Sequence, residues 1–129
     1  MGDGKVGVVD VRDVADVATV ILTSDGHEGQ SYVLTGPETL SMGDIAVKLS
    51  ATLGKEIRYV DLPPTEAKAG MTAMGMTDVV ADAWVQLSQM ISMGKADMAT
   101  PTVKEVTGTE PRSFDQFAND FAPVFKVTA

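Results

Sequence analysis

Apolar and polar residues follow one another along this chain in short blocks that predict alternating strands and helices. Val6-Gly7-Val8-Val9 is short and β-branched, which indicates a strand, and Asp10 stands after it where a helix N-cap belongs. Asp13 and Asp16 favour the start of the helix expected there through its dipole, and Arg12 is expected to pair with Asp16 one turn on. One face of this helix carries apolar residues at helical spacing: Val11, Val14, Ala15, Ala18, Ile21 and Leu22.

A second block repeats the order of strand and helix. Gln30 to Leu34 alternates as a strand, Gly36-Pro37 breaks it, and Ser41 is expected to cap a second helix that stops at Gly54. Glu56 to Leu62 then predicts a third strand.

The rest of the chain reads mainly as helix. We expect a short helix over residues 65–74, and Thr77 is placed to cap the longest helix of the chain. The face of that helix expected to be buried carries Val80, Trp84, Leu87 and Ile91.

Two capping-box patterns, Thr102-x-x-Glu105 and Ser113-x-x-Gln116, predict the last two helices, and Pro123 is expected to end or kink the final one. The predicted fold class is therefore α/β, in one domain over residues 1–129. We expect a small, mostly parallel sheet, in which Val6–Val9 pairs with Ile57–Val60, covered by five or six helices.

The amino-acid composition and net charge favour some classes of binding partner over others. Of the 129 residues, 44% are hydrophobic and 22% charged, a balance that supports one modest core. Eighteen acidic and ten basic residues give a net charge of −8, which disfavours nucleic acid and anionic membranes. The absence of cysteine excludes disulfides, thiolate catalysis and cysteine-based zinc sites. Without a signal peptide or an apolar stretch of roughly 20 residues, the expected location is the cytoplasm, with no membrane contact.

Three short patterns have both a chemical and a structural explanation, and the structural one is preferred for each. Gly2 to Gly7 matches the glycine pattern G-x-G-x-x-G of dinucleotide-binding folds, but a strand follows it where a helix should open. The carboxylates of residues 10–16 could act in acid–base chemistry or bind a hard cation, but helix capping explains them. His27 stands alone in a loop next to Gly26, where we expect it to be solvated rather than to bind a metal.

Methionines gather around the single tryptophan. Six of the eight lie between Met71 and Met98, and flexible thioether side chains can fill a core or line an adaptable pocket. Core filling is the simpler explanation, and a pocket for a small apolar ligand, or an interface, is the alternative. The candidate residues of that pocket or interface are Trp84, Met71, Met74, Met90 and Tyr59.

Three passages together resemble the C-terminal, substrate-side half of NmrA-like proteins, which are atypical short-chain dehydrogenases/reductases. The passages are Val9-Asp10-Val11-Arg12-Asp13-Val14-Ala15, Tyr32-Val33-Leu34-Thr35-Gly36-Pro37-Glu38 and Thr107-Gly108-Thr109-Glu110-Pro111-Arg112-Ser113-Phe114. The resemblance implies a Rossmann fold without its nucleotide-binding half, which is the half that carries the family's Ser, Tyr and Lys catalytic groups. No Tyr-x-x-x-Lys spacing occurs here. We therefore expect no catalytic, cofactor-binding or metal-binding residue in this chain, and NAD(P) enters only by the resemblance.

The resemblance also implies an incomplete sheet. The strand expected over residues 30–34 would be the last of the parent sheet, and its edge would lack a neighbour. The candidate edge-strand interface is Tyr32, Val33 and Leu34, and either a homodimer or a Rossmann-containing partner chain would cover it.

Two functions follow from these expectations. In the first, which we favour at this point, the chain is a non-catalytic small-molecule-binding or assembly protein that associates with itself. In the second, it is the substrate half of an NAD(P)-dependent oxidoreductase or NAD(P)-sensing regulator, completed by a separate Rossmann half.

Overall fold

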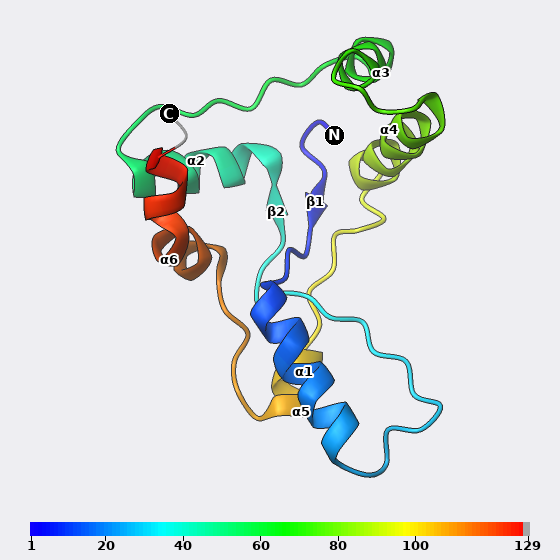
Figure 1. The fold of residues 1–129 in the computed structure, drawn as a ribbon, viewed down its shortest axis with the longest axis vertical. Helices are drawn as coiled ribbons and strands as arrows, with labels where there is room; N and C mark the ends of the chain where they lie inside the picture. The colour runs from blue at the N-terminus through cyan, green and yellow to red at the C-terminus, as the bar shows by residue number, and fades with distance from the viewer. Residues whose placement is uncertain (128–129) are drawn as a thin grey trace.

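The computed structural model describes the backbone of residues 1–127 and the side chains of residues 1–125. Within these residues, six helices and two very short strands follow one another (Figure 1). In chain order they are β1 (Lys5–Val6), α1 (Val11–Thr23), β2 (Leu40–Ser41), α2 (Met42–Leu53), α3 (Pro64–Ala73), α4 (Asp78–Ser92), α5 (Thr102–Thr107) and α6 (Phe114–Val127). The α/β class and the six helices agree with the prediction, and α4 is the longest helix, as expected.

The sheet consists of β1 and β2, and these strands are antiparallel. Lys5 lies opposite Ser41, and Val6 lies opposite Leu40. The predicted parallel pairing of Val6–Val9 with Ile57–Val60 is therefore wrong. Strand β1 is also shorter than predicted, since it ends where the backbone at Gly7 packs against another segment.

The other two predicted strands, residues 30–34 and 56–62, belong to no ladder in the structure. Side chains of neighbouring segments take up part of their backbone hydrogen bonding instead. The Thr100 hydroxyl donates to the Val33 carbonyl over 2.8 Å, and the Ile57 N–H donates to Ser50 Oγ over 2.8 Å. Each segment has the alternating sequence of a strand, but the described part of the chain places no neighbouring strand beside it to form a ladder.

The helices form three pairs around the strands: α1 with α5, α2 with α6, and α3 with α4. Figure 1 shows these pairs at separate corners of an elongated molecule, with β1 and β2 between them. The segment between α2 and α3 crosses from one pair to another.

Most helix boundaries agree with the predicted caps. The Asp10 carboxylate accepts the Arg12 N–H over 2.8 Å at the start of α1. Ser41 forms a reciprocal capping box with Asp44, and Gly54 ends α2 with a left-handed φ of 67°. The second predicted capping box is present at Ser113, whose hydroxyl accepts the Gln116 N–H.

Two predicted boundaries are wrong. Thr102 is the first residue of α5 rather than its cap, because Pro101 occupies the cap position. Pro123 lies inside α6, which continues to Val127, so the proline does not end that helix, and the alternative that it kinks the helix stays a prediction.

The buried core is small, and the most apolar helix faces lie outside it. Of the predicted α4 face, Ile91 is buried, whereas the Trp84 side chain is 46% exposed with Val80 and Leu87 beside it. On α1 the predicted face is open, with Leu22 83% exposed, because this helix turns Asp13 and Val17 inward instead. The buried apolar residues are Val17, Leu40, Ala46, Ala81, Ile91, Val103 and Ala118.

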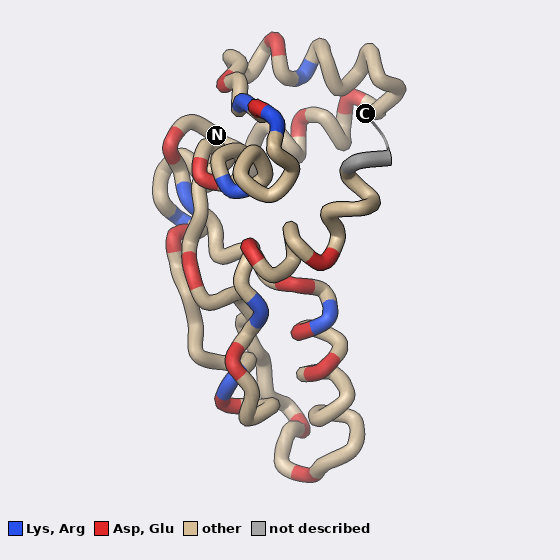
Figure 2. The backbone as a smooth tube through the Cα atoms, turned by 90° about the vertical axis from the view of Figure 1, so that its left-hand side faces the viewer, with Lys and Arg blue, Asp and Glu red and all other residues tan. Residues whose placement is uncertain are grey.

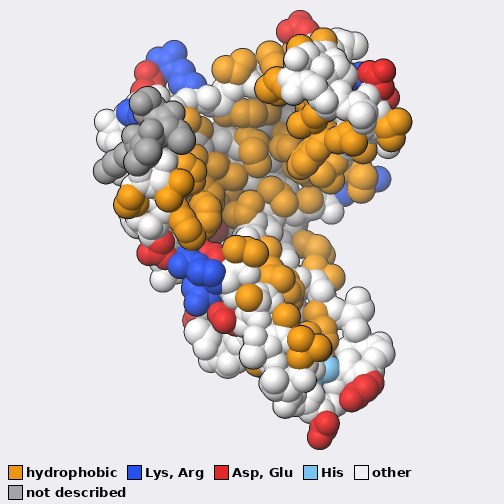
Figure 3. Space-filling view, in the orientation of Figure 1, with side chains coloured by type: hydrophobic (Ala, Val, Ile, Leu, Met, Phe, Trp, Pro, Cys, Tyr) orange, Lys and Arg blue, Asp and Glu red, His pale blue; other side chains and the backbone are white. Residues whose placement is uncertain are grey.

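The total accessible surface area also shows that the apolar helix faces are uncovered. The chain has 8292 Å² of accessible surface. A compact monomer of 13.6 kDa exposes roughly 6,600 Å², so this chain exposes about 1,700 Å² more. Hydrophobic side chains gather in the hollow between the α2–α6 and α3–α4 pairs (Figure 3). Apolar side chains gathered on an exposed face are typical of interaction surfaces.

Charged residues are spread over the whole molecule rather than concentrated at one end (Figure 2). Within residues 1–127, no helix combines the length and the apolarity needed to cross a membrane.

Six charged residues fix α1 against α6 and the chain that enters it. Asp13 is buried, and its carboxylate accepts the Arg112 N–H over 2.7 Å and pairs with the Arg112 guanidinium. Asp10 pairs with Arg12 over 2.6 Å, and the hydrogen bonds from this arginine hold the pKa of Asp10 below its usual range. The predicted pair between Arg12 and Asp16 is wrong. Arg12 reaches Asp120 in α6 instead, whereas Asp16 pairs with Arg112.

Three glycines allow the N-terminal segment to lie against other backbones. A Cβ added at Gly4 would stand 2.3 Å from the Ile91 carbonyl oxygen, and one at Gly36 would stand 2.2 Å from that of Val8. At Gly7 the corresponding neighbour is the Met98 carbonyl oxygen, at 2.4 Å. Each contact is with main chain, which cannot move aside as a flexible side chain would.

We predict that Gly4→Ala and Gly36→Ala each lower the free energy of unfolding by about 1–3 kcal/mol, since the new methyl group would force backbones apart. Gly70→Ala in α3, where a Cβ meets nothing within 4 Å, is the matched control and should stabilise by up to about 1 kcal/mol. Urea denaturation followed by circular dichroism measures all three. Equal effects at Gly4 and Gly70 would contradict the close approach.

Asp13→Asn should destabilise the fold by about 1–3 kcal/mol, because it leaves Arg112 without its buried partner. Asp16→Asn removes an exposed partner of the same arginine and should change stability by less than about 1 kcal/mol. The same denaturation assay compares the pair of variants. A loss at Asp16 as large as at Asp13 would show that burial does not matter here.

Candidate functional site

A cavity of about 440 Å³ lies between the segment that leads into α3, the helices α3 and α4, and the N-terminus. Residues 59–62 form one wall, α3 contributes Met71, and α4 contributes Val85. The remaining lining residues are Met1, Gly2, Met42, Pro64, Ala67, Ser88, Gln89 and Ser92. This volume lies within the usual range of small-molecule sites, and the walls are largely apolar.

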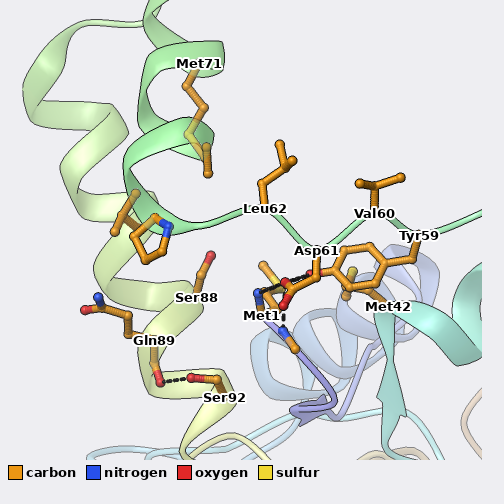
Figure 4. A pocket seen from close by; sticks show the side chains of 14 residues that line it. Met1, Met42, Tyr59, Val60, Asp61, Leu62, Met71, Ser88, Gln89 and Ser92 are labelled. Atoms are coloured by element: carbon orange, nitrogen blue, oxygen red, sulfur yellow. Dashed lines mark hydrogen bonds and ion pairs between the residues drawn. The ribbon is translucent and has the colours of Figure 1, made fainter.

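The wall formed by residues 59–62 has two faces. Figure 4 shows Asp61 turned toward Met1, whereas Val60 and Leu62 point the other way. The two prolines after Leu62 start α3 without a side-chain cap, with Pro64 as the first helical residue. They thereby set where α3 begins relative to this wall.

Hydrogen bonds concentrate at the Asp61 end of the cavity. Asp61 Oδ1 accepts the Tyr59 hydroxyl over 2.6 Å, the Gly2 N–H over 3.0 Å and the Met1 ammonium over 3.0 Å. These donors, with Tyr59 the strongest, hold the pKa of Asp61 well below its usual range. Burial and the adjacent carboxylate raise the pKa of Tyr59 to about 12. At neutral pH this end therefore presents a carboxylate and a neutral phenol.

The structure divides the five predicted pocket residues. Tyr59 and Met71 line the cavity. Met74, Trp84 and Met90 do not belong to its lining and are exposed, Met74 at 78%. Trp84 and Met90 lie instead on the uncovered face of α4.

The predicted edge interface lies in a segment without strand structure. Tyr32 is held by a 2.7 Å hydrogen bond between its hydroxyl and His27 Nδ1, and the Val33 side chain is exposed, while Leu34 is half-buried. His27 also contacts Ser24 Oγ, so it is less free than the solvated loop residue that was predicted. The Ser24 hydroxyl also donates to the Val20 carbonyl over 2.7 Å, which is the usual local hydrogen bond of a serine at the end of a helix.

Asp61 was missed at the level of sequence. The only signal was one acidic residue inside the apolar run Val60-Asp61-Leu62 just before two prolines. That pattern is also usual for a half-exposed strand, so spacing alone did not single it out.

The remaining candidate patterns have structural partners. No helix opens in the glycine pattern of residues 2–7, where β1 follows Gly4 and the Gly4 backbone packs against Ile91. A smaller cavity of about 300 Å³ lies beside Asp10 and Arg112, whose charges are already paired. Among the described residues, no three His, Asp or Glu side chains are grouped to hold a metal ion.

Relatives were found over nearly the whole chain. It is 42% identical over 125 residues to an NAD(P)H azoreductase of Xenophilus azovorans, which is 97% of this chain and 44% of the relative. It is 36% identical over 124 residues to a (4-alkanoyl-5-oxo-2,5-dihydrofuran-3-yl)methyl phosphate reductase of Streptomyces griseus, again covering 44% of the relative. The chain thus spans less than half the length of these relatives. No family model matches it.

Solved structures show the same fold. An NADPH-dependent quinone oxidoreductase of Escherichia coli superposes with a TM-score of 0.82 at 24% identity, over 93% of this chain and 44% of that one. A triphenylmethane reductase of Citrobacter sp. complexed with NADP(H) gives 0.80 at 23% identity, over 94% and 42%. The resemblance to one part of NAD(P)-binding reductases, inferred from sequence, is therefore confirmed.

Proposed function

We propose that this chain, which is similar over nearly its whole length to less than half of an NAD(P)H azoreductase and of other reductases, is the C-terminal part of an NmrA-like protein and forms the acceptor-binding half of an NAD(P)H-dependent reductase. A nucleotide-binding half, on the same or on a separate polypeptide, would supply the dinucleotide. The hydride would pass to a small apolar acceptor held in the 440 Å³ cavity.

The exposure of the apolar helix faces carries this proposal. Val11 on α1 is 71% exposed. Trp84 is 46% exposed on α4, which also forms a wall of the cavity. Sequence patterning marks these faces for burial, yet nothing in the described chain covers them. A second half of the protein that docks on them would bury the excess area and close one side of the molecule.

The extended segment before β2 gives independent support. Within the described chain, the N–H groups of Tyr32 and Leu34 donate to no protein acceptor. In an extended segment these two groups face the same edge, whereas the Val33 backbone faces the opposite edge, where the Thr100 hydroxyl donates to its carbonyl. A free edge beside half-exposed apolar side chains is one to which another strand can add. The nucleotide-binding half would extend its sheet by pairing here.

Self-association is the second candidate, favoured by the same free edge. Two copies related by a twofold axis could pair residues 32–34 with each other and bury the face of α1. In that case the chain would be a non-catalytic binding or assembly protein, and a small apolar ligand would occupy the cavity.

A chimera distinguishes the two. When this chain replaces the matching segment of the Xenophilus azovorans azoreductase, we expect NAD(P)H oxidation that depends on an added azo dye, whereas the chain alone should show none. Leu62→Asp in the chimera should lower turnover about 10-fold or more, because it puts a charge in the apolar wall.

Val47→Asp is the matched control, since Val47 is an exposed apolar residue of α2 outside the cavity lining, and its turnover should stay unchanged. Light scattering on the chain alone measures whether it forms a homodimer in solution. A folded but inactive chimera, together with a stable homodimer of the isolated chain, would favour the assembly protein over the reductase half.

A further inference from the structure

The extended segment between α2 and α3 has the alternation of a strand but no strand beside it. Figure 4 shows Val60 and Leu62 turned to one side of this segment and Asp61 to the other. In an extended backbone the N–H and C=O groups of residues two apart point to the same edge. The odd-numbered residues of 57–61 therefore form one edge, and the even-numbered residues of 58–62 form the other.

The two edges differ in what they contact. On the first edge, the Ile57 N–H donates to Ser50 Oγ over 2.8 Å, and the Ser50 hydroxyl reaches the Ile57 carbonyl over 3.2 Å. On the second edge, the main-chain N–H and C=O groups of Arg58, Val60 and Leu62 have no protein partner within the described chain. Helix α2 thus holds the segment from one edge and leaves the other edge free.

Apolar side chains accompany the free edge. Val60 is 68% exposed, and Leu62 is 48% exposed. Free main-chain groups beside uncovered apolar side chains are what an added strand uses, since the ladder gives affinity and the side chains give contact area.

This edge also belongs to the wall of the cavity. Residues 59–62 line it as extended chain, whereas the other lining residues lie in α2, α3, α4 or the turn at residues 1–2. Helical backbone is already paired within its own helix, so it offers no ladder to a neighbour. Residues 30–34, the other segment with a free edge, do not line the cavity.

Hydride transfer sets a condition on where the nucleotide-binding half docks. The donor and acceptor atoms have to come within about 3–3.5 Å of each other. A dinucleotide carried by that half reaches an acceptor in the cavity only if the half touches the cavity wall. Pairing at residues 32–34 alone does not provide this contact.

We propose that a strand of the nucleotide-binding half pairs with the free edge of Arg58, Val60 and Leu62 and so brings the dinucleotide to the cavity. This inference rests on the proposed function, because it names where that half meets the acceptor site. The similar reductases match this chain over 44% of their own length, so more than half of each lies outside the match. A second copy fits less well, because two chains of net charge −8 repel each other.

Hydrogen exchange tests the pairing residue by residue, on the chain alone and on the azoreductase chimera. In the chain alone, the amides of Arg58, Val60 and Leu62 should exchange freely. In the chimera we expect these three to exchange about 10-fold more slowly or less, while Tyr59 and Asp61, which face the other edge, change little. Equal protection of all five would indicate burial without pairing and would overturn the inference.

Val60→Pro removes one N–H from the free edge. Because this N–H has no acceptor in the described chain, the urea midpoint of the chain alone should stay unchanged, whereas turnover of the chimera should fall about 10-fold or more. Val60→Ile keeps the N–H and is the matched control, with both values unchanged. Ile57→Pro removes the N–H that Ser50 accepts, so it should already lower the midpoint of the chain alone.

The two measurements separate this inference from the proposed function. An active chimera without the alternating protection leaves the reductase half standing and shows that it docks elsewhere. The alternating protection in an inactive chimera supports the docking and contradicts the reductase. Protection of the same three amides in the chain alone at high concentration would assign the edge to a second copy and overturn the inference.

Discussion

Two buried carboxylates at the start of α1 hold together parts of the chain that are far apart in sequence. Asp13 binds both the backbone and the side chain of Arg112, 99 residues later. Asp10 aligns the Arg12 guanidinium, which continues to Asp120 in α6. Because burying an unpaired carboxylate is strongly unfavourable, α1 can pack only where both arginines reach it. The direction of α1 and the entry into α6 therefore depend on these pairs.

This constraint also decides which face of α1 is left open. With Asp13 and Val17 turned inward, Val11 and Leu22 point away from the described chain. The helix pairs at the other corners stand apart from α1 (Figure 1) and have exposed apolar residues of their own, such as Val47 on α2 and Trp84 on α4. The cavity belongs to this arrangement, because its walls come from the segment that crosses between two helix pairs and from the α3–α4 pair itself.

Most of the local capping was predictable from the sequence, although the Thr102 cap and the Arg12–Asp16 pair were wrong, and long-range pairing was not predictable. The caps at Asp10, Ser41 and Ser113 depend on residues three or fewer positions away, and all three are present. The predicted strand pairing was wrong because a ladder needs a neighbouring strand, and a local sequence pattern does not identify that neighbour. The apolar face of α4 was identified as a pattern, but its burial depends on a surface that the described chain does not supply.

The candidate site shows the same division. Met71 was identified because flexible thioether side chains can line a pocket, Tyr59 was named with it, and both line the cavity. Trp84 was chosen as the centre of the methionine cluster, yet helix geometry places it on a different side of α4 from Val85. Asp61 became visible only when the fold brought the N-terminus to it, 60 residues away in the chain.

The glycine contacts of the first residues bear on the order in which the molecule can assemble. Gly4 lies against Ile91, Gly7 against Met98 and Gly36 against Val8, so the centre is built from pieces distant in sequence. Contacts of this kind slow folding, because long loops must close before any of them forms. During synthesis residues 1–9 are made before the residues near Met98 that they contact. The β-branched run at residues 6–9 therefore stays exposed until that later segment has been made. Helices α1 and α2 can form early, whereas the strand pair at the centre is consolidated among the last steps.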